Sequence, residues 1–149
     1  MRLSRITLAL ISAGMLWAAG AATAATAMDG SAAKLPAETV QGQARYISGG
    51  IGRGEALAFE HAQSRYPLSL EFAQKAKPHD EFTAGVKVMV RDARGKIALA
   101  TVSQGPFLLA KLPAGRYDIK ATQDGRTLER HATVTDGGHA HVAFVWPQA

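Results

Sequence analysis

Apolar and polar side chains alternate along the second half of the chain, from Val86 to Trp146. Val86, Val88 and Val90 point to one side of an extended segment, and the residues between them point to the other. Clusters of glycine, proline and aspartate interrupt this alternation about every 8 to 12 residues. Such a pattern is typical of a β-sandwich or barrel of short strands, and it does not fit a helical bundle or a parallel sheet.

Two further strands and one helix are predicted before this region. Residues 44–48 and 68–72 are the strands, and residues 55–65 are the helix, with Phe59 and Ala62 within one narrow arc. Pro67 ends the helix, because proline disfavours helical geometry at the residue before it. The expected fold is therefore mainly β: an antiparallel β-sandwich of about seven to eight strands with one N-terminal helix.

A glycine cluster lies between the first strand and the helix, at Gly49, Gly50, Gly52 and Gly54. A dinucleotide-binding turn would need G-x-G-x-x-G, and Leu57 stands where the third glycine of that motif would be. No G-K-[ST] motif for a nucleoside triphosphate follows. We therefore predict a turn whose glycines supply positive φ angles, and no cofactor.

The first 27 residues have the pattern of a secretory signal peptide, with two arginines, an apolar run and small residues at the end. Cleavage is expected after Ala24 or Ala27, and residues 28–43 are predicted to form a flexible leader. The apolar run is shorter than the roughly 20 residues that span a bilayer. We expect export to the periplasm without stable membrane insertion after cleavage.

Composition narrows the possible chemistry. The chain has no cysteine, which removes disulfides, thiolate catalysis and cysteine-containing zinc sites. Its net charge is +5, and without Arg2 and Arg5 it is +3, with both signs interspersed along the sequence. This balance indicates a solvated surface and no nucleic-acid partner.

Histidines are the remaining metal-ligand candidates, and none lies in an H-E-x-x-H motif. If residues 136–138 close a hairpin, Thr133 lies opposite His141, and His131 lies diagonal to it. His139 shares that face, because it is two residues from His141 along the strand. The three imidazoles would then form an exposed patch able to hold copper or zinc weakly. The alternative is that they only decorate a solvated strand.

No catalytic residue is predicted. Neither G-x-S-x-G nor S-x-x-K occurs. Paired carboxylates assemble in space, so spacing alone does not exclude them. A small hydrolase with an unrecognised site is thus a further alternative.

Two turn motifs carry a resemblance to a known family. Residues 112–119, LPAGRYDI, are similar to L-P-x-G-x-Y-x-[VI], and a D-x-x-G turn at Asp92 to Gly95 precedes them. Pro113 fixes φ, Gly115 is expected in a conformation that bulkier residues avoid, and Tyr117 can pack its ring while its hydroxyl ties down the adjoining chain. This region resembles the carboxypeptidase regulatory-like domain, a transthyretin-like (prealbumin-like) sandwich.

The resemblance implies a domain at residues 82–149, with residues 44–75 forming a β-α-β preface packed on it. In the carboxypeptidases the module has no catalytic residues, which implies a binding or stabilising role. A related branch that hydrolyses 5-hydroxyisourate ends in Y-R-G-S, whereas this chain ends FVWPQA. We predict a non-catalytic periplasmic module that binds an envelope protein or glycan through loops or an open sheet edge. The apolar run Pro106 to Leu109 has large side chains on both faces. One face is expected to be buried by the helix, which needs a place for Phe59, and the alternative is that this face binds a partner.

Overall fold

The computed structural model describes residues 34–148. The predicted signal peptide, both cleavage sites (after Ala24 or Ala27) and the first part of the leader lie outside these residues. Within the described range, no helix combines the length and apolar character needed to cross a membrane.

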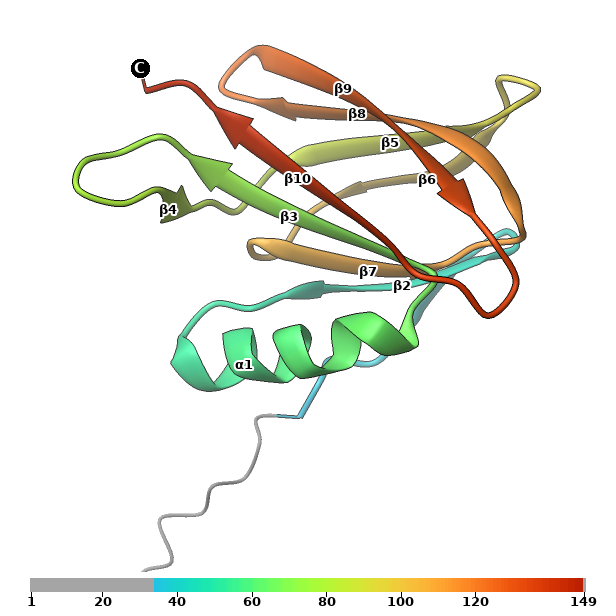
Figure 1. Ribbon diagram of the computed structural model, residues 1–149, viewed down its shortest axis with the longest axis horizontal. Coiled ribbons are helices and arrows are strands. Elements are labelled where there is room, and N and C mark those ends of the chain that lie inside the picture. The colour runs from blue at the N-terminus through green and yellow to red at the C-terminus, as the bar shows by residue number, and fades with distance from the viewer. Residues whose placement is uncertain (1–33, 149) are drawn as a thin grey trace, which may run out of the picture. The chain divides into compact units, whose positions relative to one another are not determined.

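Two sheets and one helix make up the described part of the chain (Figure 1). Sheet A contains β1 (Thr39–Gln41), β2 (Ala44–Gly49), β7 (Phe107–Lys111), β3 (Leu68–Gln74) and β10 (Ala140–Trp146) in that order, and β4 (Glu81–Phe82) pairs with β3. Sheet B contains β6 (Ile97–Val102), β5 (Lys87–Asp92), β8 (Gly115–Gln123) and β9 (Arg126–Val134). The mainly β fold with one helix is confirmed, and β1 and β4 are two short strands beyond the predicted eight.

The main core lies between the inner faces of the two sheets. It includes the predicted alternating residues Val86, Val88 and Val90, together with Phe144 and Trp146. Each of these side chains is at most 2% exposed. The alternation in the sequence therefore identified the inner face correctly.

Ile97 departs from this alternation, because β6 contains a bulge. Val90 pairs with Leu99 and Arg91 pairs with Ile97, so Ala98 is an extra residue on β6. Leu99 points inward and is fully buried, whereas Ile97 points outward and is 46% exposed.

One strand pair departs from the predicted antiparallel pattern. β10 pairs with β3 in parallel, with Ala140 opposite Leu68 and Trp146 opposite Gln74. A parallel pair needs a long crossover connection. Here that connection is the whole segment from β4 to β9, which contains all of sheet B and two strands of sheet A, β4 and β7.

Residues 44–75 do not form a separate preface packed on the sandwich. β2 and β3 are internal strands of sheet A, and β7 lies between them, antiparallel to both. The predicted boundary between residues 75 and 82 therefore divides one sheet. The reason is that strands 82–149 alone leave sheet A with only β4, β7 and β10, which do not pair with one another.

The helix α1 (Arg53–Ala62), continued by the 3-10 turn η1 (Gln63–Arg65), packs on the outer face of sheet A (Figure 1). Phe59 is fully buried there and stacks on Phe107, with ring centroids 6.0 Å apart. Leu109 belongs to the same cluster, whereas Leu108 points into the main core. The prediction that the helix buries one face of the run Pro106 to Leu109 is confirmed for Phe107 and Leu109.

The predicted flexible leader is corrected for residues 34–43. Leu35 packs against the cluster beneath α1, and β1 pairs with β2. Glu38 Oε1 accepts hydrogen bonds from Lys111 Nζ at 2.7 Å and from Tyr66 Oη at 3.1 Å. The Lys111 ammonium is the largest influence holding the pKa of Glu38 below its ordinary value. The sequence of this segment did not indicate an ordered structure, because Glu38 contacts Lys111 and Tyr66, which are far away along the chain.

Gln41 connects the edges of the two sheets. Its Oε1 accepts a hydrogen bond from Ala100 N at 2.6 Å, and its Nε2 donates to Ala100 O at 3.0 Å. The side-chain amide thus pairs with the β6 backbone as a neighbouring strand would, and it links β1 to β6.

Replacing this amide should weaken the sandwich measurably. We expect Gln41→Ala to lower the free energy of unfolding by about 1 kcal/mol, because two hydrogen bonds on a partly exposed edge are lost. The measurement is urea unfolding followed by circular dichroism. Gln43→Ala is the matched control, since Gln43 is exposed, and its effect should stay within about 0.5 kcal/mol. Equal effects of the two substitutions would contradict a bridging role for Gln41.

Candidate functional site

The glycine cluster forms a turn at the start of α1. Gly50 has φ 99° and Gly52 has φ 86°, so the predicted positive φ is confirmed for these two glycines and is wrong for Gly49 and Gly54. Glu55 Oε1 accepts a hydrogen bond from Gly50 N at 2.8 Å. A Cβ built on Gly49 would overlap this same Glu55 oxygen. A carboxylate of the protein itself therefore occupies the place where a bound phosphate would sit.

The three predicted histidines do not form one patch. β9 pairs with β8 in sheet B and β10 pairs with β3 in sheet A, so the predicted pairing of Thr133 with His141 is wrong. His131 lies on the outer face of sheet B, and His141 lies on the outer face of sheet A. Residues 135–139 cross between the sheets instead of closing a hairpin, because Ala132, Val134 and Phe144 all bury into the shared core.

Each of these histidines has its own hydrogen-bond partner. His131 Nδ1 contacts Asp118 Oδ1 at 2.6 Å. His139 Nδ1 donates to Tyr66 O at 2.8 Å. Within residues 34–148, no group of three or more potential ligand side chains is arranged to hold a metal ion. The alternative of a weak copper or zinc site loses the geometry on which it depended.

His141 takes part in a polar cluster that the sequence did not reveal. Its Nδ1 lies 2.8 Å from Ser69 Oγ, and its Nε2 lies 3.5 Å from Glu71 Oε2. Serine, histidine and glutamate are the residue types of a hydrolytic triad. Ser69, however, is only 1% exposed, between β7 and β10 in sheet A, so a substrate cannot reach its hydroxyl. The sequence indicated only that each strand has a polar face. It did not indicate the contact between Ser69 and His141, which are 72 positions apart.

One end of the sandwich gathers the turns that carry the family resemblance. The β1–β2, β5–β6 and β7–β8 connections all lie at this end, at the right of Figure 1. Between them is a recess of about 600 Å³, the loop-end pocket, whose lining includes Gln43, Arg94, Lys96, Pro113, Arg116 and Tyr117. Its size lies within the range of small-ligand sites.

The β5–β6 turn has the predicted Asp92 to Gly95 geometry. Asp92 Oδ1 accepts hydrogen bonds from the backbone N–H groups of Arg94 and Lys96, both at 2.9 Å. Gly95 has φ 80°, and its N–H donates to Asp92 O at 2.9 Å. Asp92 Oδ1 therefore stabilises the backbone of its own turn. Arg94 and Lys96, in the same turn, are exposed.

The β7–β8 turn is held by Tyr117. Its ring is buried, and its hydroxyl donates to Pro113 O at 2.5 Å. Burial, followed by the charge of Asp92, raises the pKa of Tyr117 above its ordinary value, so the phenol stays a donor at neutral pH. Gly115 has φ 159°, which is close to fully extended, so the predicted requirement for glycine at this position is not supported.

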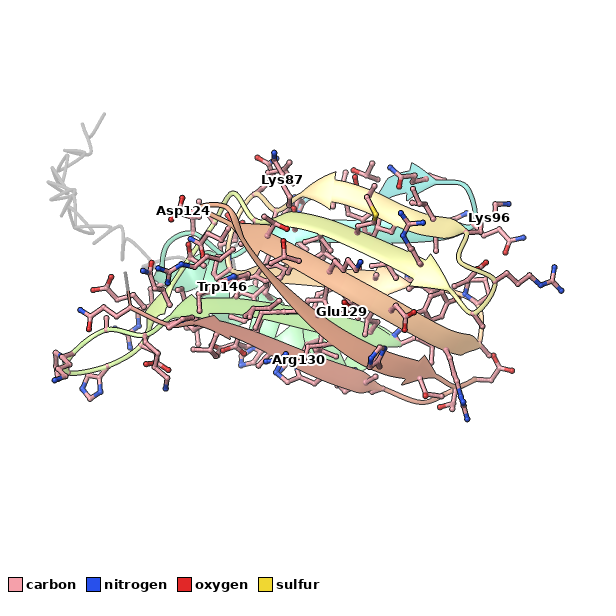
Figure 2. The ribbon with its side chains drawn as sticks, turned by 90° about the horizontal axis from the view of Figure 1, so that it is seen from above. Lys87, Lys96, Asp124, Glu129, Arg130 and Trp146 are labelled. Atoms are coloured by element: carbon pink, nitrogen blue, oxygen red, sulfur yellow. The ribbon has the colours of Figure 1, made fainter. Side chains whose placement is uncertain are left out.

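Three cations line the loop-end pocket. Arg94, Lys96 and Arg116 are exposed, and none of them forms one of the salt bridges found among residues 34–148. Figure 2 shows Lys96 at this end of the sheets, whereas Lys87 lies toward the other end. The lining thus carries an excess of positive charge, because Asp92 is its only acidic residue.

A second recess, of about 510 Å³, lies near the opposite end, between α1 and β4. Three exposed apolar side chains line it: Ile51 is 64% exposed, Leu57 44% and Phe82 55%. Phe82 lies against Phe107, with ring centroids 5.4 Å apart. Arg53 and Glu60 are the charged residues of this lining, one of each sign, so the two recesses differ in net charge and in apolar surface.

Comparisons with known proteins leave the family undecided. No protein-family model matches the chain, and no curated protein matches it either. The likeness to the carboxypeptidase regulatory-like domain therefore depends on the two turn motifs and on the chemistry of their residues.

Proposed function

We propose that this protein is an exported, non-catalytic binding module of the bacterial envelope, with a fold of the carboxypeptidase regulatory-like type. The loop-end pocket is its binding surface, and the partner is an envelope glycan or protein. The observation that carries the proposal is a concave site made by three turns on a rigid scaffold. Loops held by rigid sheets are where binding residues concentrate.

Three further features support this assignment. The side chains of the turns are committed to structure: Asp92 binds backbone N–H groups, and Tyr117 binds a carbonyl. Gln43, Arg94, Lys96 and Arg116 also line the pocket, and their side chains are exposed, so they can contact a ligand. The Ser69 hydroxyl is covered, which disfavours the hydrolase alternative.

Site-specific crosslinking in intact cells tests the proposal. A photoreactive amino acid at Ala93 or Ala114, both on the loop-end pocket, should yield adducts that mass spectrometry identifies as one envelope protein or one glycan. The same amino acid at Lys77, in the exposed β3–β4 connection, is the control and should give none. The intact mass should correspond to a chain beginning at Ala25 or Met28.

Two outcomes would contradict the proposal. Adducts formed equally from the loop-end and control positions would show that the pocket has no special role. Recovery of the uncleaved precursor in the cytoplasm would exclude an envelope partner.

A further inference from the structure

We infer that the loop-end pocket binds a sugar that carries a phosphate or carboxylate group. This inference rests on the proposed function, because it names the ligand class of the same pocket. The first observation is the positive charge of the pocket lining. Arg94 and Lys96 lie in the β5–β6 turn, Arg116 lies at the start of β8, and all three line one recess.

The lining keeps an excess of positive charge. Asp92 is its only acidic residue, so a single carboxylate is set against the three cations Arg94, Lys96 and Arg116. Asp118, the nearest acid along β8, contacts His131 on the outer face of sheet B. A cationic recess of this kind attracts anions and concentrates them near its mouth.

The guanidinium groups of Arg94 and Arg116 favour a ligand with a planar or tetrahedral oxyanion, such as a carboxylate or a phosphate. Arginine presents parallel N–H donors that match carboxylate and phosphate oxygens in a bidentate manner, and lysine adds a point charge. These charge-assisted hydrogen bonds are roughly twice as strong as neutral ones. The anionic group of the ligand is therefore placed at the rim, between the two turns.

The rest of the lining suits a sugar ring. Gln43 is exposed and offers an amide donor and acceptor for hydroxyl groups. Pro113 and Ala114 present small apolar surface beside it. The recess is concave and of about 600 Å³, which fits a compact ligand better than a flat membrane surface.

Titration of the ¹⁵N-labelled purified protein tests the inference. Glucose 6-phosphate and glucuronate should shift the amide resonances of Ala93, Gly95 and Ala114, and glucose at the same concentration should not. Affinity should fall as salt is added, because exposed charges are screened. Inorganic phosphate alone should bind more weakly than glucose 6-phosphate, since it lacks the ring contacts.

A matched pair of triple variants localises the effect. Arg94→Ala, Lys96→Ala and Arg116→Ala together should weaken binding of both anionic probes by about tenfold or more. Arg53→Ala, Lys77→Ala and Lys87→Ala remove the same charge from exposed positions elsewhere. This control should keep the affinity of the unmodified protein.

Any one of three results would overturn the inference. Glucose binding as tightly as its phosphate, equal losses in both triple variants, or binding only to phosphatidylglycerol vesicles would each exclude an anionic sugar. If no probe binds but crosslinks still concentrate at Ala93 and Ala114, the ligand class is wrong and the proposed function stands. If the crosslinks also fail to concentrate there, both are wrong.

Discussion

Phe59→Ala is expected to lower the free energy of unfolding by about 3 to 5 kcal/mol. Phe59 is fully buried, stacks on Phe107 and shares a cluster with Ile47, Tyr66 and Leu109. Removing the ring leaves a cavity between α1 and sheet A, and the helix has no other fully buried large side chain to hold it there. Urea unfolding followed by circular dichroism measures the loss.

Two further variants test whether the loss of stability comes from weaker packing of α1 on sheet A. Leu57→Ala changes a residue of the same helix that is 44% exposed, and it should cost less than about 1 kcal/mol. Phe59→Leu keeps most of the buried volume and should recover a large part of the stability. If Phe59→Ala and Leu57→Ala destabilise the protein equally, α1 does not contribute its buried face to the stability of sheet A.

Gly105→Ala is the second substitution with a large expected effect, a loss of about 3 kcal/mol. A Cβ at this position would overlap the carbonyl group of Gly49. The contact is with backbone, so no side-chain rotation relieves it, and the end of β2 must separate from the start of β7. Thermal and urea unfolding of the variant test this expectation.

Gly42→Ala is the matched control for the close approach. Gly42 has φ 57° and no atom within 4 Å of a built Cβ, so alanine there meets only the left-handed backbone. Its cost should be about 1 to 2 kcal/mol. A Gly105→Ala protein as stable as the unmodified one would mean that β2 and β7 approach less closely than the structure indicates.

These substitutions affect the scaffold, whereas the anionic-sugar inference concerns only the surface of the loop-end pocket. Arg94, Lys96 and Arg116 are exposed and form no salt bridge within residues 34–148. Their replacement should therefore change ligand binding with little effect on stability. If the inference is correct, these variants should lose binding without losing stability.

The features that depend on neighbouring residues could be predicted from the sequence. Alternation identified the inward residues Val86, Val88 and Val90, and the D-x-x-G pattern identified the β5–β6 turn. The helix and its buried residue Phe59 followed from a period of 3.6 residues. Each of these features depends on neighbours within a few positions, so the residues themselves carry the information.

The candidate site was only partly predictable. The motifs placed Asp92, Gly95 and Pro113 at turns and gave Tyr117 the role of tying down the second turn, and the structure agrees, with Tyr117 itself in β8. Nothing in the motifs indicated that both turns meet at one end of the sandwich and surround a cationic recess. The histidine patch failed for the same reason, because the assumed β9–β10 hairpin is instead a crossing between sheets.

The sequence by itself determined which segments are strands, where most of them turn and which side of each strand is apolar, because side-chain period and turn chemistry act over a few residues. Only the tertiary structure decided that β10 lies parallel to β3 and that β7 enters between β2 and β3. Those pairings join residues tens of positions apart. Many registers satisfy the same alternation, and the burial of one shared core selects among them.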